Sequence, residues 1–371
     1  MSFSPLTIPS FYCPIPVEVA PGAEEINQGT VAWLDRFGVC RDGKQRDRLA
    51  DMNIGLSACL TVPDGSAQLR QIYSDLTLWF YAVDDSIADE STTGVSPQLS
   101  VQLLWLARML ERPATELSGN QPWMTRSLRD ALLRLHRHAG PVAITQWADS
   151  VHSFILNLLL SITTRPERQT PGLDEYVVTR MSQGGQLVVK MIPIVGDYRL
   201  APNDKYDPRV QALEEMVSFL TAWGNDIFGY DKEVFRSHRY GYPSIPGALS
   251  VLALENDCSI QQAVPIATAF HDRVMCLFMR LRQQVLRDAA PELARYLTGL
   301  GQWIRGYLEW ALTSERYQDP RNPDDDVVIE RPSMPTVRDT GPVDDVMEPL
   351  PIPTIAWWWE MLDDAAGRST G

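Results

Sequence analysis

The chain has 371 residues and a formal net charge of −14, and its five cysteines and five histidines are scattered along its length. The acidic balance excludes a protein that binds nucleic acid over a broad surface, because that kind of phosphate binding needs clustered Lys and Arg. The odd number of cysteines and the absence of ligand spacing favour neither a disulfide framework nor a zinc site.

Apolar residues recur at helical spacing through most of the chain, and alternating strand-like patterns are few. The periodic stretches are 68–83, 99–111, 127–136, 145–162, 174–195, 208–228, 262–286 and 291–313. Many of the gaps between them carry Pro, Gly or Asp, which favour turns. We therefore predict one all-α domain over residues 1–317, because no change in composition divides it.

The character of the chain changes after this domain. Residues 318–353 are rich in Pro and Asp and show no periodicity, which predicts a mobile linker. The acidic run 324–326 within it is expected to be solvated. Residues 354–371 begin with an apolar stretch that holds three consecutive tryptophans, at 357–359. We predict a short aromatic segment that packs over the opening of the functional site.

Two clusters of acidic residues, 84–90 and 225–233, each follow an apolar helix-like run. Helical spacing would place their oxygen-bearing side chains on single faces, so that the two helices could face each other across a pocket. Mg²⁺ is usually bound by one or two carboxylates, water and substrate phosphate oxygens. The candidate metal-binding positions are Asp84, Asp85, Asp89, Asn225, Gly229 and Glu233. For the first cluster alone, a solvated helix end is an equal alternative.

These residues resemble the class I terpene synthases of bacteria and fungi, with their aspartate-rich motif and their Asn-Asp-x-x-Ser-x-x-x-Glu motif. Arg180 stands where that family has its diphosphate-sensing arginine, and Arg316-Tyr317 matches its late Arg-Tyr pair. Lys232 matches a further diphosphate contact. Gly229 departs from the family, which has Ser or Thr there, and we expect water to take that coordination place.

The resemblance implies a single class I terpenoid synthase-like helical bundle around a central apolar cavity. It also implies an enzyme with three Mg²⁺ ions that ionises a prenyl diphosphate and cyclises the allylic cation. Arg180 would then act in catalysis, together with Gly184 at a helix break that presents a backbone carbonyl to the cation. Phe80, Tyr81, Trp303 and Trp310 are candidate cavity-wall residues that stabilise positive charge, although packing in the core is an equal alternative for each.

The resemblance favours farnesyl diphosphate as substrate, while the small side chains at Gly184 and Val189 leave room for geranylgeranyl diphosphate. Two alternatives remain open. An all-α chain-elongating prenyltransferase would carry a second aspartate-rich cluster in place of Asn225 and Glu233, and a non-catalytic helical binding protein would not need the ordered motifs. We expect a cytoplasmic protein without stable membrane anchoring, because no signal peptide or membrane-length apolar run is evident. A homodimer is left open.

Overall fold

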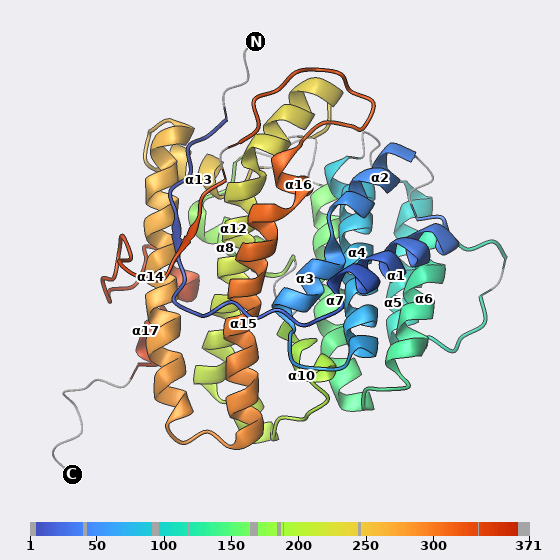
Figure 1. The fold of residues 1–371 in the computed structure, drawn as a ribbon, viewed down its shortest axis with the longest axis horizontal. Helices are drawn as coiled ribbons and strands as arrows, with labels where there is room; N and C mark the ends of the chain where they lie inside the picture. The colour runs from blue at the N-terminus through green and yellow to red at the C-terminus, as the bar shows by residue number, and fades with distance from the viewer. Residues whose placement is uncertain are drawn as a thin grey trace.

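The computed structural model describes residues 5–39, 43–90, 96–117, 119–163, 170–183, 187, 189–243, 246–332 and 334–362. Over these residues the chain is a bundle of helices with one two-stranded parallel sheet, in which β1 (Phe11–Tyr12) pairs with β2 (Val337–Arg338). This pairing lays the N-terminal segment beside a stretch close to the C-terminus (Figure 1). No helix in the described part of the chain has both the length and the apolar character needed to cross a membrane.

The helical elements account for every periodic stretch predicted above, and they add others that the apolar pattern does not predict. In chain order they are α1 (Ala23–Phe37), α2 (Gly43–Asp51), α3 (Ile54–Thr61), α4 (Ala67–Asp84), η1 (Asp85–Asp89), α5 (Pro97–Glu111), α6 (Trp123–Leu135), α7 (Pro141–Thr163), α8 (Leu173–Met181), α10 (Ile192–Val195), α11 (Pro202–Lys205), α12 (Pro208–Tyr240), α13 (Ala248–Glu255), α14 (Ile260–Leu286), α15 (Pro291–Thr313), α16 (Glu315–Gln318), η3 (Pro353–Ile355) and α17 (Trp357–Glu360). The all-α prediction is confirmed.

The periodic stretch 174–195 corresponds to more than one helix. Helix α8 ends at Met181, and α10 is a separate short helix. The break begins just before Gly184, the position that the resemblance assigns to a helix break. Gly184 itself lies outside the described residues, so its predicted role stays a prediction.

Helix α12 is 33 residues long and carries the second acidic cluster within it, not at its end. It begins at Pro208, where the side chain of Asp207 accepts a hydrogen bond from the Arg209 backbone N–H, and it ends at Gly241 in the left-handed conformation with φ 71°. It packs against α14 and α15. Most of the length of α12 is therefore held in the core, and the acidic cluster has a rigid support.

The first acidic cluster lies where α4 passes into a π-helical turn, η1. Ser66 caps the start of α4 through its side chain. At the other end the Glu90 N–H donates to the Asp85 carbonyl oxygen at 2.8 Å, the i+5 to i bond that defines a π turn. An α-helix would place residues five apart on different faces, whereas the wider turn brings Asp84 and Asp89 closer together.

Helix α15 is set tightly against α3. A Cβ at Gly306 would lie 2.3 Å from the Leu60 carbonyl oxygen, so only glycine permits this approach. Further along, Trp310 Nε1 and Ser314 Oγ both donate to the Met52 carbonyl oxygen, at 2.8 Å and 3.2 Å. These contacts fix the start of α16, which carries Arg316 and Tyr317.

Residues beyond α16 make defined side-chain contacts with the bundle. Asp325 accepts two hydrogen bonds from Arg239 and one from Tyr240. Trp358 in α17 is fully buried, and its Nε1 donates to Glu215 Oε2 at 2.8 Å on the first half of α12. The prediction that this segment covers the functional site is wrong for the residues through 362, because they pack on the flank of the bundle. The division at 317 and 353 into domain, linker and segment stays a prediction.

Candidate active site

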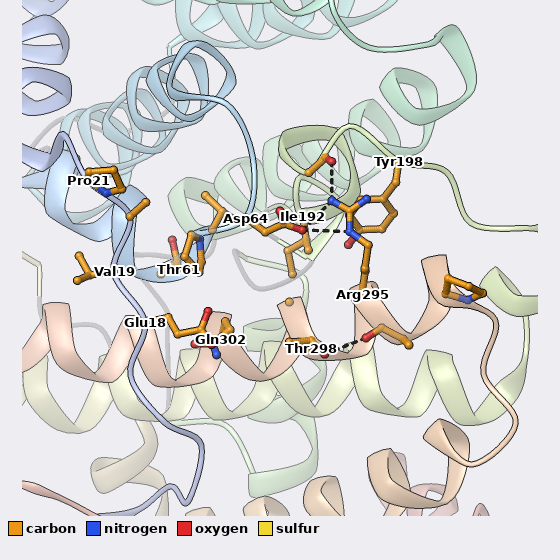
Figure 2. A pocket seen from close by; sticks show the side chains of 17 residues that line it. Glu18, Val19, Pro21, Thr61, Asp64, Ile192, Tyr198, Arg295, Thr298 and Gln302 are labelled. Atoms are coloured by element: carbon orange, nitrogen blue, oxygen red, sulfur yellow. Dashed lines mark hydrogen bonds and ion pairs between the residues drawn. The ribbon is translucent and has the colours of Figure 1, made fainter.

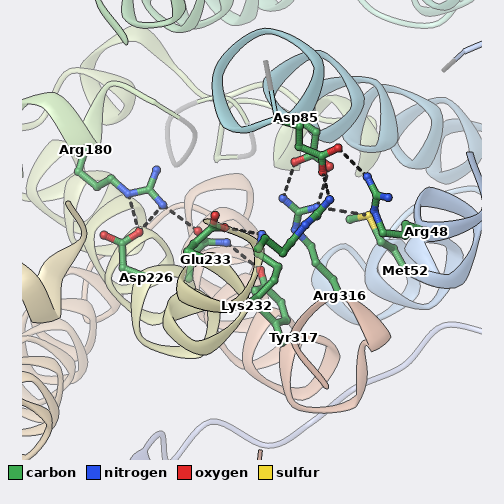
Figure 3. A network of polar contacts seen from close by, with 12 residues as sticks. Arg48, Met52, Asp85, Arg180, Asp226, Lys232, Glu233, Arg316 and Tyr317 are labelled. Atoms are coloured by element: carbon green, nitrogen blue, oxygen red, sulfur yellow. Dashed lines mark hydrogen bonds and ion pairs between the residues drawn. The ribbon is translucent and has the colours of Figure 1, made fainter. Parts of the chain in front are cut away.

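Side chains from the two acidic clusters, α8 and α16 converge in one network of polar contacts (Figure 3). Helix α16 lies near one end of the bundle (Figure 1). Asp85 is the first residue of η1, Lys232 and Glu233 lie on α12, and Arg316 and Tyr317 come from α16. Side chains from segments more than 200 residues apart in sequence, such as Asp85 and Arg316, are thus brought into direct contact.

Asp85 and Arg316 form a buried pair with two parallel hydrogen bonds. Arg316 Nη1 donates to Asp85 Oδ2 at 3.0 Å, and Nη2 donates to Oδ1 at 2.9 Å. Their side chains are 4% and 8% exposed. Burial opposes ionisation of Asp85, but the charge and hydrogen bonds of Arg316 outweigh it, so the pKa of Asp85 lies below its ordinary value. The guanidinium also lies 4.6 Å from the centre of the Tyr81 ring.

For Asp84 and Asp89, two other acids of the first cluster, the ionised form is destabilised. Burial, and next the repulsion by Asp85, raise the pKa of Asp84 to about 6. Burial raises the pKa of Asp89 well above its ordinary value, and the charges of Asp84 and Glu233 raise it further. Because Glu233 lies on α12, the repulsion between its charge and Asp89 is an interaction between the two acidic clusters.

Asn225 and Arg180 are in direct contact. Arg180 Nη2 donates to Asn225 Oδ1 at 2.7 Å, and Asn225 Nδ2 donates to the Tyr317 hydroxyl at 2.7 Å. Arg180 also donates to Asp226 Oδ1 through Nε at 2.9 Å and to Gln183 through Nη1. Burial disfavours the charge of Arg180, but Asp226 outweighs this and raises the pKa of Arg180.

Glu233 and Gly229 complete the second cluster. Lys232 Nζ lies 2.6 Å from Glu233 Oε1, with the lysine side chain 6% exposed. At Gly229 a Cβ would meet only Tyr317 Cε1, at 3.8 Å, which is an ordinary van der Waals contact. A small side chain would therefore fit at Gly229 without displacing its neighbours.

Several residues at this end of the bundle were not predicted as functional. Asp226 pairs with Arg180, and its Oδ2 accepts from the Tyr176 hydroxyl at 2.5 Å and from the Ala248 N–H at 3.0 Å. The feature of the sequence that could have identified Asp226 is its position directly after Asn225. Glu90 lies 2.6 Å from both Arg48 and Arg236, contacts that no local pattern in the sequence predicts.

The predicted aromatic residues lie in three different packing environments. Tyr81 and Trp310 have ring centres 5.9 Å apart next to Arg316, and Trp310 also lies edge-on to Tyr317. Trp303 stacks on Tyr307 and donates from Nε1 to the Tyr73 hydroxyl at 3.0 Å. Phe80 lies among other aromatic side chains, Trp79, Trp147 and Phe154. Each therefore has a packing role, whatever its part in catalysis.

The donor set fits a hard divalent cation. Among the residues that the structure describes, no three His, Cys, Asp or Glu side chains are close enough to hold one metal ion as they stand. The clusters do present carboxylate and amide oxygens, which such cations prefer. Burial, together with repulsion from neighbouring carboxylates, raises the pKa values of Asp84 and Asp89, and a bound cation would offset both effects.

A separate cavity of about 780 Å³ lies along the first half of α15 and includes Glu18, Asp64, Arg295 and Gln302 in its lining (Figure 2). Arg295 donates to Asp64 Oδ2 at 2.7 Å and lies over the Tyr198 ring. Arg316 follows the opposite end of the same helix, so the converging acids are not part of this cavity.

Comparison with known proteins agrees with this geometry. Residues 75–276 match the family described as terpene synthase family 2, C-terminal metal binding. Bonnadiene synthase from Allokutzneria albata is 34% identical, over 96% of this chain and 98% of that protein. A germacradien-6-ol synthase from Streptomyces pratensis is 32% identical, over 96% of this chain and 98% of that protein.

Solved structures show the same fold. The ancestrally reconstructed protein SVS_A2 is 25% identical, with a TM-score of 0.79 over 96% of this chain and 100% of that chain. Hedycaryol synthase, at 20% identity and a TM-score of 0.67, covers 82% of this chain and 98% of its own and shares the fold. The matched metal-binding region contains both acidic clusters, and the relatives are synthases, so a non-catalytic binding protein is ruled out. The chain belongs to the class I terpene synthases of the bacterial type.

Proposed function

We propose that this terpene cyclase uses Mg²⁺ to ionise a linear prenyl diphosphate, with farnesyl diphosphate preferred over geranylgeranyl diphosphate. The allylic cation would cyclise to a hydrocarbon or alcohol, with release of diphosphate. The observation that supports this proposal is a set of three contacts between side chains. In each contact one side chain offers an oxygen that suits a metal ion, and the other is a cation that suits diphosphate. They are Asp85 with Arg316, Asn225 with Arg180, and Glu233 with Lys232.

The metal ligands would come from both sides of the site, with three ions expected from the family resemblance. They are Asp84, Asp85 and Asp89 from the first cluster, and Asn225 and Glu233 from the second, with water in place of a side chain at Gly229. Bound magnesium supplies positive charge that offsets the negative charge developing on the leaving group. The three contacts must open for this, which frees the cations for the substrate.

The protein's own cations would then bind the leaving group. Arg180, Lys232, Arg316 and the Tyr317 hydroxyl would donate hydrogen bonds to diphosphate oxygens, and these strengthen as charge develops. The carbon–oxygen bond breaks with its electron pair remaining on diphosphate, so this step needs no general base. Tyr81 contacts Arg316 through its ring and Trp310 packs on Tyr81, so both would lie close to the departing group, which suits them to stabilise the early cation.

The later course of the cation depends on the cavity wall. Phe80 and Trp303 are the remaining aromatic candidates, and Gly184 would present a backbone carbonyl. Water must be excluded to prevent early quenching of the cation. These roles rest on the family resemblance together with the aromatic packing described above.

Chain length is the property on which the relatives divide. A T-muurolol synthase of Streptomyces clavuligerus, 28% identical, is described as cyclising farnesyl diphosphate. A diterpene cyclase from a Streptomyces species is 23% identical. Val189 is fully buried and small, which leaves the longer substrate as the second candidate.

The test is incubation of purified protein with Mg²⁺ and, separately, geranyl, farnesyl and geranylgeranyl diphosphate, followed by gas chromatography and mass spectrometry. We expect a cyclic product from farnesyl diphosphate that is lost with EDTA. Arg316→Gln should abolish it, whereas Arg46→Gln, an exposed arginine paired with Asp35, should not. Products from none of the three diphosphates would refute the proposal, and elongated diphosphates formed only with isopentenyl diphosphate would indicate a prenyltransferase.

A further inference from the structure

One acidic side chain at the active site lies outside the predicted metal ligands. Glu90 directly follows Asp89 and is held by two arginines. Its Oε2 lies 2.6 Å from Arg48 Nη2, and its Oε1 lies 2.6 Å from Arg236 Nη2. The side chains of Glu90, Arg48 and Arg236 are 10%, 16% and 6% exposed, so water screens their attraction only weakly.

The two arginines come from elements on either side of the π turn. Arg48 lies on α2, and Gln45 of the same helix donates to Ser86 Oγ within the π turn at 3.2 Å. Arg236 lies on α12, three residues beyond the last acid of the second cluster. Glu90 therefore ties the turn that carries the first cluster to the helix that carries the second.

A further set of contacts closes a ring around this tie. Arg48 Nη1 donates to Asn322 Oδ1 at 2.5 Å, and the Asn322 N–H donates to the Tyr240 hydroxyl at 2.8 Å. Tyr240 is the last residue of α12, the helix that also carries Arg236. We call this set the Glu90 ring: Glu90, Arg48, Asn322, Tyr240 and Arg236.

We propose that Glu90 is a positioning residue for the metal site. The Glu90 ring holds Glu90 in place, so that the π turn with Asp89 stays fixed against α12, the helix that carries Glu233. This inference rests on the proposed function of the two clusters as metal ligands. A π turn is rare and is kept only where its surroundings favour it, and the contacts of Glu90 and Ser86 supply such surroundings. Outer partners of metal ligands typically contribute 10- to 100-fold to metal affinity.

The variant Arg48→Gln separates positioning from simple charge. It removes a positive charge near the site and leaves the negative charge of Glu90 intact, so charge alone predicts tighter binding of Mg²⁺. Positioning predicts the opposite, because Glu90 loses one of its two partners. We expect Arg48→Gln to bind Mg²⁺ about 10-fold more weakly in the presence of inorganic pyrophosphate, measured by titration calorimetry.

Two further variants serve as controls for the loss of charge at Arg48 and for the loss of an arginine from α2. Arg48→Lys keeps the charge but cannot contact Glu90 and Asn322 together through a planar fork, so it should recover part of the affinity. Arg46→Gln removes a positive charge from the same helix, where Arg46 pairs with Asp35 and not with Glu90, and should bind like the wild type. Thermal unfolding curves of each variant would check that it is folded at the temperature of the titration.

The outcomes are separable. Mg²⁺-dependent binding of pyrophosphate to the wild type supports the proposed function by itself, and its absence refutes both proposals. With that binding present, an Arg48→Gln variant that binds Mg²⁺ as tightly as the wild type, or more tightly, overturns the positioning role. In turnover assays, Arg48→Gln should require about 10-fold more Mg²⁺ for half-maximal rate, with a kcat close to that of the wild type at saturating Mg²⁺.

Discussion

Replacing Gly229 tests whether its position on α12 contributes to metal binding. A Cβ there would contact only Tyr317 Cε1, at 3.8 Å, so Ala fits, and Ser adds a single oxygen to that Cβ. Glycine inside a helix costs about 1 kcal/mol relative to Ala. We expect Gly229→Ala to raise the free energy of unfolding by about 1 kcal/mol and Gly229→Ser by about half of that, since Ser has the lower helix propensity.

The two variants should differ in their response to Mg²⁺. A bound water that replaces a protein ligand costs up to about 2 kcal/mol of immobilisation entropy, which a fixed hydroxyl avoids. We expect Gly229→Ser to lower the Mg²⁺ concentration for half-maximal turnover by about 10-fold, or roughly 1.4 kcal/mol. Gly229→Ala should leave it unchanged. Equal Mg²⁺ requirements for the Ser and Ala variants would refute the assignment of this position to the metal site.

Three further predictions concern buried groups. Asp85→Asn leaves Arg316 buried without its counter-ion. We therefore expect the free energy of unfolding, measured in denaturant, to fall by about 3–5 kcal/mol and the rate of cyclisation to fall about 100-fold or more. A stability close to that of the wild type would contradict the buried pairing. Burial lowers the pKa of Lys205 from 10.5 to about 8 in the folded protein. Between these two pH values the folded protein therefore binds fewer protons than the unfolded chain, so the free energy of unfolding should rise with pH, by about 3 kcal/mol over the window. Lys205→Met should remove this rise in pH-dependent denaturation curves, and an unchanged slope would exclude Lys205 as its source. Trp358→Ala should lower the free energy of unfolding by about 3–5 kcal/mol, because Trp358 is fully buried. It should leave kcat within about twofold, because Trp358 lies on the flank of the bundle. A large loss of kcat in the folded variant would show that this segment contributes to the reaction.

The helices that the sequence predicts well are those with one apolar face. Helix α15, for example, begins and ends at the predicted residues, 291 and 313. Helix α2 was not predicted, because Leu49 is its one buried residue and no stripe repeats. Helix α3 was not predicted for the opposite reason: seven of its eight residues are buried, so no polar face marks the period.

The second half of α12 shows where the apolar pattern stops being informative. The predicted stretch ends at 228, but the helix continues to Tyr240. Asp231, Lys232 and Arg236 in this half are each about 5% exposed, because the fold supplies charged or polar partners for them. Buried charges of this kind depend on residues far away in sequence, which periodicity cannot reveal.

The same limit applies to the site. The family motifs in the sequence point to Asp85, Asn225 and Arg316, and the structure brings all three to one end of the bundle. The contacts that Asp226 and Glu90 make beside these motifs depend on tertiary structure, although the position of Asp226 directly after Asn225 is visible in the sequence. An acidic residue beside a motif is ordinarily a solvated one, so its burial is the information that the structure adds.

The contacts between the predicted metal ligands and the predicted diphosphate contacts have a thermodynamic consequence. A metal ion that takes Asp85 would leave Arg316 without its carboxylate acceptor, and one that takes Asn225 would remove one of the acceptors of Arg180. Diphosphate alone would take the cations away from Asp85 and Glu233. Each ligand therefore binds better when the other is present, and the gain is equal in both directions because the coupling free energy is shared. Since Arg316 and Arg180 lie deep enough for their charges to be weakly screened, this coupling should persist at salt concentrations that abolish surface ion pairs. We therefore predict that the metal ion and diphosphate each bind more weakly alone than together.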